Sequence, residues 1–152
     1  KAIMKIGNWV GPLLVSAAEN GIERLLVIGY HGKLIKLAGG IFHTHHHLAD
    51  SRLEILAAFA VKQGISLNTI QHLLKTETLE SAYLYMAKEN EEIAQKLWNY
   101  LANEVENRSF AYIQRYGSWP IKVGAALFDR QRRIRWVGSI GHQHLVSYGV
   151  SL

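Results

Sequence analysis

Cysteine is absent from this chain of 152 residues, so disulfide bridges and thiolate metal sites are both excluded. The chain also lacks an apolar run long enough to span a bilayer, and no signal peptide is visible at its start. The absence of cysteine is compatible with a reducing compartment. We therefore expect a cytoplasmic protein without a membrane partner.

Long runs of one charge are missing too, although the formal net charge is +5. This excess favours an anionic partner, such as a polycarboxylate, a phosphate compound or a nucleic acid. The densest basic group lies between Arg130 and Arg135, beside Trp136, and no DNA- or RNA-binding signature accompanies it. We interpret this group as a solvated turn and expect no nucleic-acid partner.

Length and composition are typical of one globular domain. Hydrophobic residues make up 49% of the chain and charged residues 19%, which is ordinary for a soluble domain. A chain of this length can bury one core. We expect residues 1–152 to form a single domain. Because the first residue is Lys1, we further expect a fragment of a longer protein or a processed chain.

The spacing of apolar residues predicts alternating strands and helices. Short apolar runs predict strands at 24–28, covered on both faces, and at 121–128, and the end of another strand at 1–6. A polar turn at 129–132 and a return strand at 133–140 would complete a C-terminal hairpin. Helices are predicted at 9–20, 33–38, 48–63, 66–74 and 79–86. This order favours an α/β fold, with helices packed on a small mixed sheet.

One more helix is predicted to begin at Asn90, whose side chain is suited to an N-terminal cap. Four apolar residues then follow at intervals of four, and they would lie on one side of the helix. They are Ile93, Leu97, Leu101 and Val105. We interpret this stripe as core packing.

Residues 29–54, GYHGKLIKLAGGIFHTHHHLADSRLE, combine glycine with polar residues directly after the strand predicted at 24–28. Proteins with α/β folds usually bind ligands at such strand ends. Gly29 and Gly32 can let a ligand approach the backbone, although their spacing is not that of a P-loop. Lys33 and Lys36 would share one face of a helical turn and suit ligand carboxylates, or simply form a solvated face.

Two further groups in this segment could bind ligands. The histidines from His43 to His47 could ligate Zn²⁺, Ni²⁺ or Co²⁺, or could line a ligand site or an exposed loop. Asp50, Arg52 and Glu54 start the next helix and suit a cationic or hydroxyl-bearing ligand, unless the acids only complement the helix dipole. No catalytic triad or acid–base pair of carboxylates can be assigned.

The run GYHGKLIKLAGGIFHTHHHLADSRLEIL closely resembles the signature of the cobalt-precorrin-5B C1-methyltransferase (CbiD) family, which reads approximately GHIGKLVKLAAGIxxTHSxxADxRxE. Upstream, IGNWVG…AAENGIERLLVIG resembles the family's approach to this motif. The positions that match are Gly29, Gly32, Lys33, Leu34, Lys36, Leu37, Ala38, Gly40, Ile41, Thr44, His45, Ala49, Asp50, Arg52 and Glu54. The chain departs from the pattern at Tyr30, His31, His46 and Ser51.

The resemblance implies methylation at C1 of cobalt-precorrin-5B, giving cobalt-precorrin-6A, in anaerobic cobalamin biosynthesis. It implies S-adenosyl-L-methionine as methyl donor and a polycarboxylate cobalt tetrapyrrole as substrate. Because the family's proteins are longer, the chain is similar to their carboxy-terminal domain, and a fragment of this kind need not be active alone.

The resemblance also implies roles for individual residues. The cationic side chains would bind carboxylates of the macrocycle: Lys33, Lys36 and Arg52. Glycine backbones would approach either ligand: Gly29, Gly32, Gly39 and Gly40. Asp50 or Glu54 would hold ribose hydroxyls or the cationic methionine end of the donor. Thr44 and His45, the predicted catalytic residues, would orient a ligand carboxylate or remove a proton.

Two other functions stay open at the level of sequence. One is a non-catalytic binding domain for an anionic small molecule. The other is a metal-binding protein that uses the loop from His43 to His47.

Overall fold

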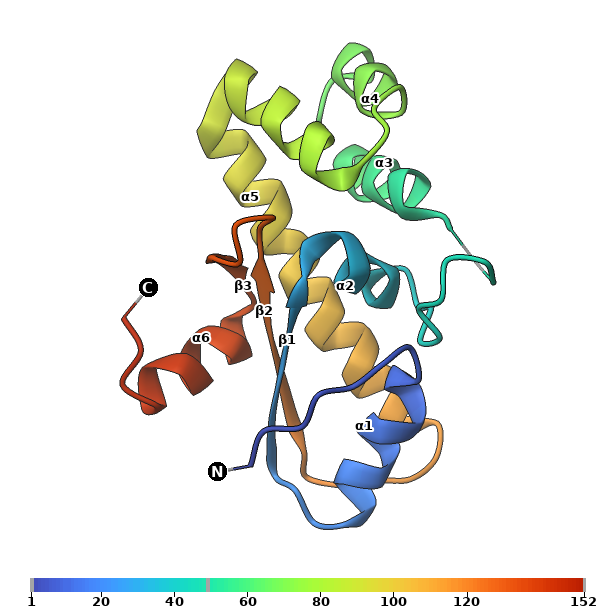
Figure 1. Cartoon of the computed structure of the whole chain (residues 1–152), viewed down its shortest axis with the longest axis vertical. Helices are drawn as coiled ribbons and strands as arrows, with labels where there is room; N and C mark the ends of the chain where they lie inside the picture. The colour runs from blue at the N-terminus through green and yellow to red at the C-terminus, as the bar shows by residue number, and fades with distance from the viewer. Residues whose placement is uncertain (1, 49, 152) are drawn as a thin grey trace.

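The computed structural model describes residues 2–48 and 50–151, which form a three-stranded sheet with helices on both faces (Figure 1). The elements in chain order are α1 (Val10–Glu19), β1 (Arg24–Tyr30), α2 (His31–Ala38), α3 (Arg52–Lys62), α4 (Leu67–Leu73), α5 (Leu79–Gln114), β2 (Lys122–Phe128), β3 (Ile134–Val137) and α6 (Ser139–Ser147). The predicted α/β class and the small mixed sheet are confirmed.

The sheet has the strand order β1-β2-β3. β1 and β2 run parallel, in a register that pairs Arg24 with Lys122 and Tyr30 with Phe128. β2 and β3 are antiparallel, which confirms the predicted C-terminal hairpin. β1 lies at the edge of the sheet and its Ile28 is 51% exposed, so the expectation that this strand is covered on both faces is wrong. The central strand, β2, is the well-covered one.

Helix α5 bends sharply at Asn90, whose backbone is extended (φ −158°, ψ 103°). The Asn90 side chain accepts a hydrogen bond from the backbone N–H of Ile93 (3.1 Å), as an N-terminal cap does. A new helical segment therefore begins here, as predicted. Leu97, Leu101 and Val105 of the predicted stripe are buried, whereas Ile93, in the first turn after the bend, is 42% exposed.

The long second segment of α5 is the support for the rest of the fold. It runs behind the sheet in Figure 1 and contacts α1, α2, β2 and β3. Most of its apolar side is buried, and Trp98 on this side lies close to Trp136 of β3 (ring centroids 6.1 Å apart). The helix therefore fixes the hairpin and the β1–α2 junction against one core.

On the opposite face of the sheet, α6 packs against β1 and β2. This helix was not predicted, because residues 133–140 were assigned to one return strand, which ends instead at Val137. The helix begins at Ser139, where the buried carboxylate of Glu106 accepts hydrogen bonds from the backbone N–H groups of Ile140 (3.1 Å) and Gly141 (2.7 Å). Its Oε1 also accepts from the N–H of Ala125 in β2 (3.0 Å).

Glycine lets α6 and β2 meet backbone to backbone. A Cβ on Gly141 would collide with the carbonyl oxygen of Ala125, and a Cβ on Gly124 would collide with the backbone of Gly141. A side chain at either position would therefore push the helix away from the strand.

Two expected element boundaries are wrong. Residues 2–6 form no strand, and Lys1 lies outside the described residues. The helix expected at 48–63 begins only at Arg52, since residues 46–48 form a turn in which the N–H of Leu48 bonds to the carbonyl of His45 (3.1 Å). Among the described residues, no helix combines the length and the hydropathy needed to cross a bilayer.

We expect Glu106→Ala to lower the free energy of unfolding by about 3–5 kcal/mol, because three backbone N–H groups, two of them buried, would lose their carboxyl acceptor. Urea unfolding followed by circular dichroism would measure this. Glu92→Ala, an exposed site on the same helix, is the matched control and should change stability by about 0.5 kcal/mol or less. A loss under about 1 kcal/mol for Glu106→Ala would contradict the role of Glu106 as the acceptor that joins α6 to β2.

Candidate functional site

The carboxyl ends of the two parallel strands lie at one edge of the sheet. β1 ends at Tyr30, where α2 begins directly, and β2 ends at Phe128 opposite it. In open α/β sheets this edge is the usual place for ligands. The chain places the beginnings of α2, α3 and α5 close to it (Figure 1).

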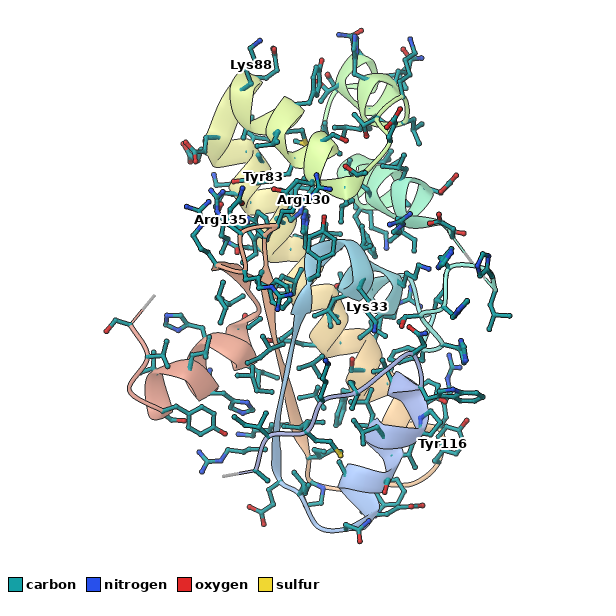
Figure 2. The ribbon with its side chains drawn as sticks, viewed as in Figure 1. Lys33, Tyr83, Lys88, Tyr116, Arg130 and Arg135 are labelled. Atoms are coloured by element: carbon teal, nitrogen blue, oxygen red, sulfur yellow. The ribbon has the colours of Figure 1, made fainter. Side chains whose placement is uncertain are left out.

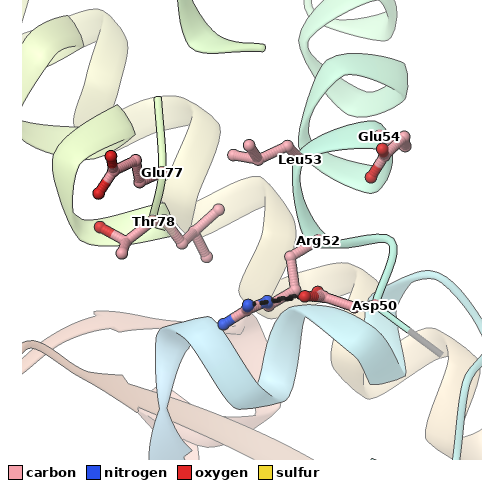
Figure 3. A pocket seen from close by; sticks show the side chains of 7 residues that line it. Asp50, Arg52, Leu53, Glu54, Glu77 and Thr78 are labelled. Atoms are coloured by element: carbon pink, nitrogen blue, oxygen red, sulfur yellow. Dashed lines mark hydrogen bonds and ion pairs between the residues drawn. The ribbon is translucent and has the colours of Figure 1, made fainter. Parts of the chain in front are cut away.

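A hollow of about 150 Å³ lies between the beginnings of α3 and α5 (Figure 3). One wall is formed by the start of α3, and the other by the turn before α5. The lining residues are Asp50, Arg52, Leu53, Glu54, Glu77, Thr78 and Leu79. Three of the lining residues are acidic and one is an arginine, so the lining has a net negative charge.

Arg52 and Asp50 form a two-pronged ion pair at the floor of this hollow, above α2 (Figure 3). The Arg52 Nε lies 2.7 Å from Oδ1 of Asp50, and Nη2 lies 2.9 Å from Oδ2. The hydrogen bonds from Arg52 lower the pKa of Asp50, so this carboxyl is ionised at neutral pH. The pair holds the guanidinium in a fixed plane with its third nitrogen, Nη1, left for other contacts.

Beneath the strand ends, His31 connects the two segments of α5. The indole N–H of Trp98 donates to Nδ1 of His31 (2.9 Å), and because an indole can only donate, Nδ1 carries no proton. The proton of the neutral ring is therefore on Nε2, which donates to Oε2 of Glu80 (2.7 Å). Burial lowers the pKa of His31 and outweighs the opposing effect of Glu80, so the ring is neutral at pH 7.

A second buried network fixes the hairpin to α5. The side-chain oxygen of Gln95 accepts from the hydroxyl of Tyr83 (3.2 Å) and from the indole of Trp136 (3.1 Å), and its nitrogen donates to the backbone of Arg135 (2.9 Å). The guanidinium of Arg135 donates in turn to the Tyr83 hydroxyl (3.2 Å), and the two residues are drawn together in Figure 2.

Two arginines of the basic group, Arg133 and Arg135, are paired within the protein. Arg133 binds the buried carboxylate of Asp129 through Nε (3.1 Å) and Nη2 (3.0 Å), and Trp136 is fully buried. Hydrogen bonds and the nearby charge of Arg133 outweigh burial and lower the pKa of Asp129, so it remains an anion. These contacts agree with the interpretation of the group as a turn.

The two lysines that were expected to share a face both lie on α2, and each ammonium binds a main-chain carbonyl. Lys33 donates to the carbonyl of Gly7 (3.1 Å), toward the N-terminal segment (Figure 2). Lys36 is only 2% exposed and donates to the carbonyl of Thr44 (3.2 Å). The two lysines thus share one helix as expected, while each ammonium is bound by a main-chain carbonyl of the protein itself. Burial lowers the pKa of Lys36, and its charge is sensed by Asp50.

Of the two residues predicted to be catalytic, Thr44 is buried and His45 is partly exposed. The hydroxyl of Thr44 donates to the side chain of Asn8 (3.1 Å), and its N–H donates to the Asn8 carbonyl (3.0 Å). Nδ1 of His45 accepts from the backbone N–H of His47 (3.3 Å). Neither residue lines the hollow.

The predicted glycines make room for side chains of the protein itself. A Cβ would collide with Leu34 at Gly29, with Tyr30 at Gly32 and with Ile55 at Gly39. Gly40 has a positive φ of 83°, which favours glycine. Of the predicted site residues, Asp50, Arg52 and Glu54 therefore share one hollow, whereas Lys33, Lys36, Thr44, His45 and the glycines lie outside its lining.

Sequence reasoning missed the second wall of the hollow, formed by Glu77, Thr78 and Leu79. A signal was present, because Thr78 and Ser81 form a capping box at the start of α5. It marks a helix start, but nothing in the sequence places this start opposite Asp50. The Glu80–His31 pair, which joins residues 49 positions apart, was missed for the same reason.

The histidine loop does not form a metal site of its own. The rings of His45, His46 and His47 lie 3.9–5.1 Å apart between centroids. Even so, no group of three or more His, Cys, Asp or Glu residues within 2–48 and 50–151 could hold a metal ion.

Comparison with known families gives one match that covers most of the chain. Residues 43–139 match the family described as "CbiD, C-terminal domain". The match includes Asp50, Arg52 and the second wall of the hollow, as well as the hairpin.

Similar proteins have the name "Cobalt-precorrin-5B C(1)-methyltransferase". One from Prochlorococcus marinus (strain MIT 9303) is 58% identical over 149 residues, which is 98% of this chain and 39% of the relative. One from Synechococcus sp. (strain CC9902) is 54% identical over 138 residues, 91% of this chain and 38% of the relative. The chain thus spans about 39% of the length of the relatives it matches. No solved structure matches.

The lowered pKa of His31 predicts a loss of stability in acid. Below the unfolded-state value near 6.5, the unfolded chain binds more protons than the folded one, so the free energy of unfolding falls as pH falls toward the folded pKa. One such group contributes a slope of at most about 1.4 kcal/mol per pH unit.

We expect His31→Gln to have a shallower decline than the wild type between pH 7.5 and 5, measured by urea unfolding at each pH. His45 and His144, whose pKa values are also lowered, remain in both proteins and cancel in the comparison. His72→Gln, at an exposed position on α4, serves as the control and should keep the wild-type slope. Equal slopes for His31→Gln and the wild type would show that His31 is not the group responsible.

Proposed function

The chain belongs to the CbiD family, and on that premise we propose that it acts as the carboxy-terminal domain of a cobalt-precorrin-5B C(1)-methyltransferase. The proposed reaction transfers a methyl group from S-adenosyl-L-methionine to C1 of the cobalt-precorrin ring, giving cobalt-precorrin-6A. The match over residues 43–139 is the observation that carries this proposal.

S-adenosyl-L-methionine supplies a methyl group on a positively charged sulfur, which an electron-rich ring carbon can displace in line while the bonding electrons stay on sulfur. A protein accelerates such a displacement mainly by aligning the reactants and excluding water. No nucleophile from the protein is required. The absence of an assignable catalytic triad in the sequence is therefore compatible with the chemistry.

The negative hollow suits the methyl donor better than the macrocycle. Its carboxylates, from Asp50, Glu54 and Glu77, can accept hydrogen bonds from ribose hydroxyls and attract a sulfonium or ammonium cation. Arg52, held in place by Asp50, can offer Nη1 to the donor's carboxylate. A polycarboxylate ring would be repelled by the same charges. The alternative of a binding domain for an anionic small molecule therefore gains no support here.

The size of the hollow indicates that it is one part of a larger site. Pockets that enclose small-molecule ligands usually have volumes of roughly 300–1,000 Å³, whereas this hollow measures about 150 Å³. It can hold one end of the donor, not the whole molecule. We propose that the remaining contacts come from the part of the family's proteins that this chain does not span.

Lys36 and Thr44 have supporting roles in this proposal. The buried ammonium of Lys36 holds the carbonyl of Thr44, and the Thr44 hydroxyl holds Asn8. These contacts fix the segment that leads from α2 to Asp50. His45 remains the proposed group for carboxylate orientation, because the segment positions it while leaving it partly exposed, and its ring can donate a hydrogen bond from Nε2.

The test is methyl transfer from S-adenosyl-L-methionine to cobalt-precorrin-5B by the full natural protein that carries this sequence. We expect Glu77→Gln and Arg52→Lys each to raise the KM for the methyl donor tenfold or more, equivalent to about 1.4 kcal/mol, with little effect on the KM for the macrocycle. Binding of S-adenosylhomocysteine, measured by calorimetry, should weaken in parallel.

Glu92→Gln, at an exposed position far along α5, is the control and should leave both constants within twofold of wild type. An unchanged KM for the donor in both hollow variants would remove the donor-site assignment. A wild-type protein that transfers no methyl group to this substrate would overturn the proposed function itself.

A further inference from the structure

A second surface of the chain has features that the donor hollow lacks. It consists of Trp9, Lys33, His46 and His47, and we call it the Trp9 face. The segment at residues 7–9 contacts both α2, which carries Lys33, and the start of the loop that carries the two histidines. Its Gly7 carbonyl accepts from Lys33 (3.1 Å), and its Trp9 forms an isolated β-bridge with His43 at the start of the histidine loop.

The loop is held on this segment by further contacts. The indole of Trp9 meets the ring of His43 edge-on, with centroids 4.4 Å apart. The backbone N–H of Thr44 donates to the carbonyl of Asn8 (3.0 Å). The loop is therefore anchored at its start, and the imidazoles of His46 and His47 that follow are exposed.

Trp9, the residue directly before α1, is 69% exposed, whereas Val10 and Leu14 of that helix are buried. Indole offers a broad apolar face that can pack on a planar ring. The ammonium of Lys33, which binds the carbonyl of Gly7 two residues before Trp9, can also pair with carboxylates. A flat metal macrocycle that bears carboxylates could use all three groups. The indole would pack on its ring, the ammonium would pair with a carboxylate, and an imidazole would bind its metal.

The histidine chemistry narrows the ligand further. A free metal ion needs several protein ligands, and no suitable group of three exists among the described residues. A cobalt ion that is already held by four ring nitrogens needs only one axial donor, and a neutral imidazole is a suitable one. A single exposed histidine can therefore bind such a cobalt where it could not hold a free ion.

The hydrogen bonds indicate which histidine is available. Nδ1 of His45 accepts from the N–H of His47, so the neutral ring of His45 carries its proton on Nε2 and presents no lone pair to solvent. Partial burial and the neighbouring imidazoles lower the pKa of His45. His46 and His47, whose rings lie 3.9 Å apart, remain the exposed donors.

We propose that the Trp9 face binds the corrinoid substrate, with the imidazole of His46 or His47 as an axial ligand of its cobalt, Trp9 against the ring and Lys33 on a peripheral carboxylate. This inference rests on the proposed function for the presence of cobalt in the substrate. It adds the mode of binding and separates the macrocycle surface from the donor hollow.

The probe is cob(II)inamide, a cobalt corrinoid without its own nitrogen base, added to the full natural protein under anaerobic conditions. A nitrogen ligand on low-spin cobalt(II) splits its electron paramagnetic resonance lines into triplets. We expect this splitting in the wild type. It should disappear in the double variant His46→Ala/His47→Ala, with at least a tenfold loss of affinity measured from the visible spectrum.

The matched controls are His72→Ala and His142→Ala, which remove exposed histidines on α4 and α6. Both should retain the splitting and an affinity within twofold of wild type. Trp9→Ala should weaken binding severalfold while keeping the splitting. The substitution removes the indole that packs on the corrinoid ring and leaves the histidine nitrogens in place. Circular dichroism would confirm that each variant is folded.

Unchanged splitting and affinity in the double variant would overturn the inference, as would equal losses in the two controls, which would mean coordination by any surface histidine. Binding of the methyl donor distinguishes a failure of this inference from a failure of the proposed function. If the double variant loses the splitting, the inference stands even when S-adenosylhomocysteine fails to bind, and that failure counts against the proposed function alone.

Discussion

The structure depends above all on one neutral imidazole. His31 stands at the point where β1 becomes α2, and it bonds on one side to Trp98 and on the other to Glu80. These partners belong to different segments of α5, which diverge at Asn90. A single ring therefore sets how the two segments sit over the strand ends. Because Glu80 lies directly after Glu77, Thr78 and Leu79, the same ring also sets the position of one wall of the hollow.

Much of the fold could be predicted from local pattern. The strands, α1, α2 and the cap at Asn90 follow from apolar spacing, glycine stops and side chains that bond to nearby backbone, all of which act within a few residues. The failures concern contacts between distant residues. α6 begins where it does because Glu106, more than thirty positions earlier, provides its cap. Ile28 is exposed because β1 lies at the edge of the sheet. The amino-acid composition of a strand does not predict whether the strand lies at the edge or in the centre of a sheet.

The candidate site divides in the same way. The sequence predicts Asp50, Arg52 and Glu54 as ligand-binding residues because they are close together at a helix start. The structure places all three around one hollow. The sequence equally predicts that Lys36 binds a ligand carboxylate. In the structure its ammonium is buried and donates a hydrogen bond to the Thr44 carbonyl. The spacing of two lysines on a helix predicts the angle between their side chains. It does not predict which other parts of the protein pack over each side chain. Similarly, the opposite wall from Glu77 to Leu79 comes from a segment whose position relative to α3 is decided by tertiary packing.

The open side of β1 has a consequence for the behaviour of the molecule in solution. Within the described part of the chain, this seven-residue strand is bonded along one side only, by β2. Its other side presents main-chain donors and acceptors in a row, with Arg24 as its single charged side chain. Such a row can template addition of a strand from a neighbouring molecule. Within the described residues, this side of β1 is therefore where another strand, from this protein or from a second molecule, can be added.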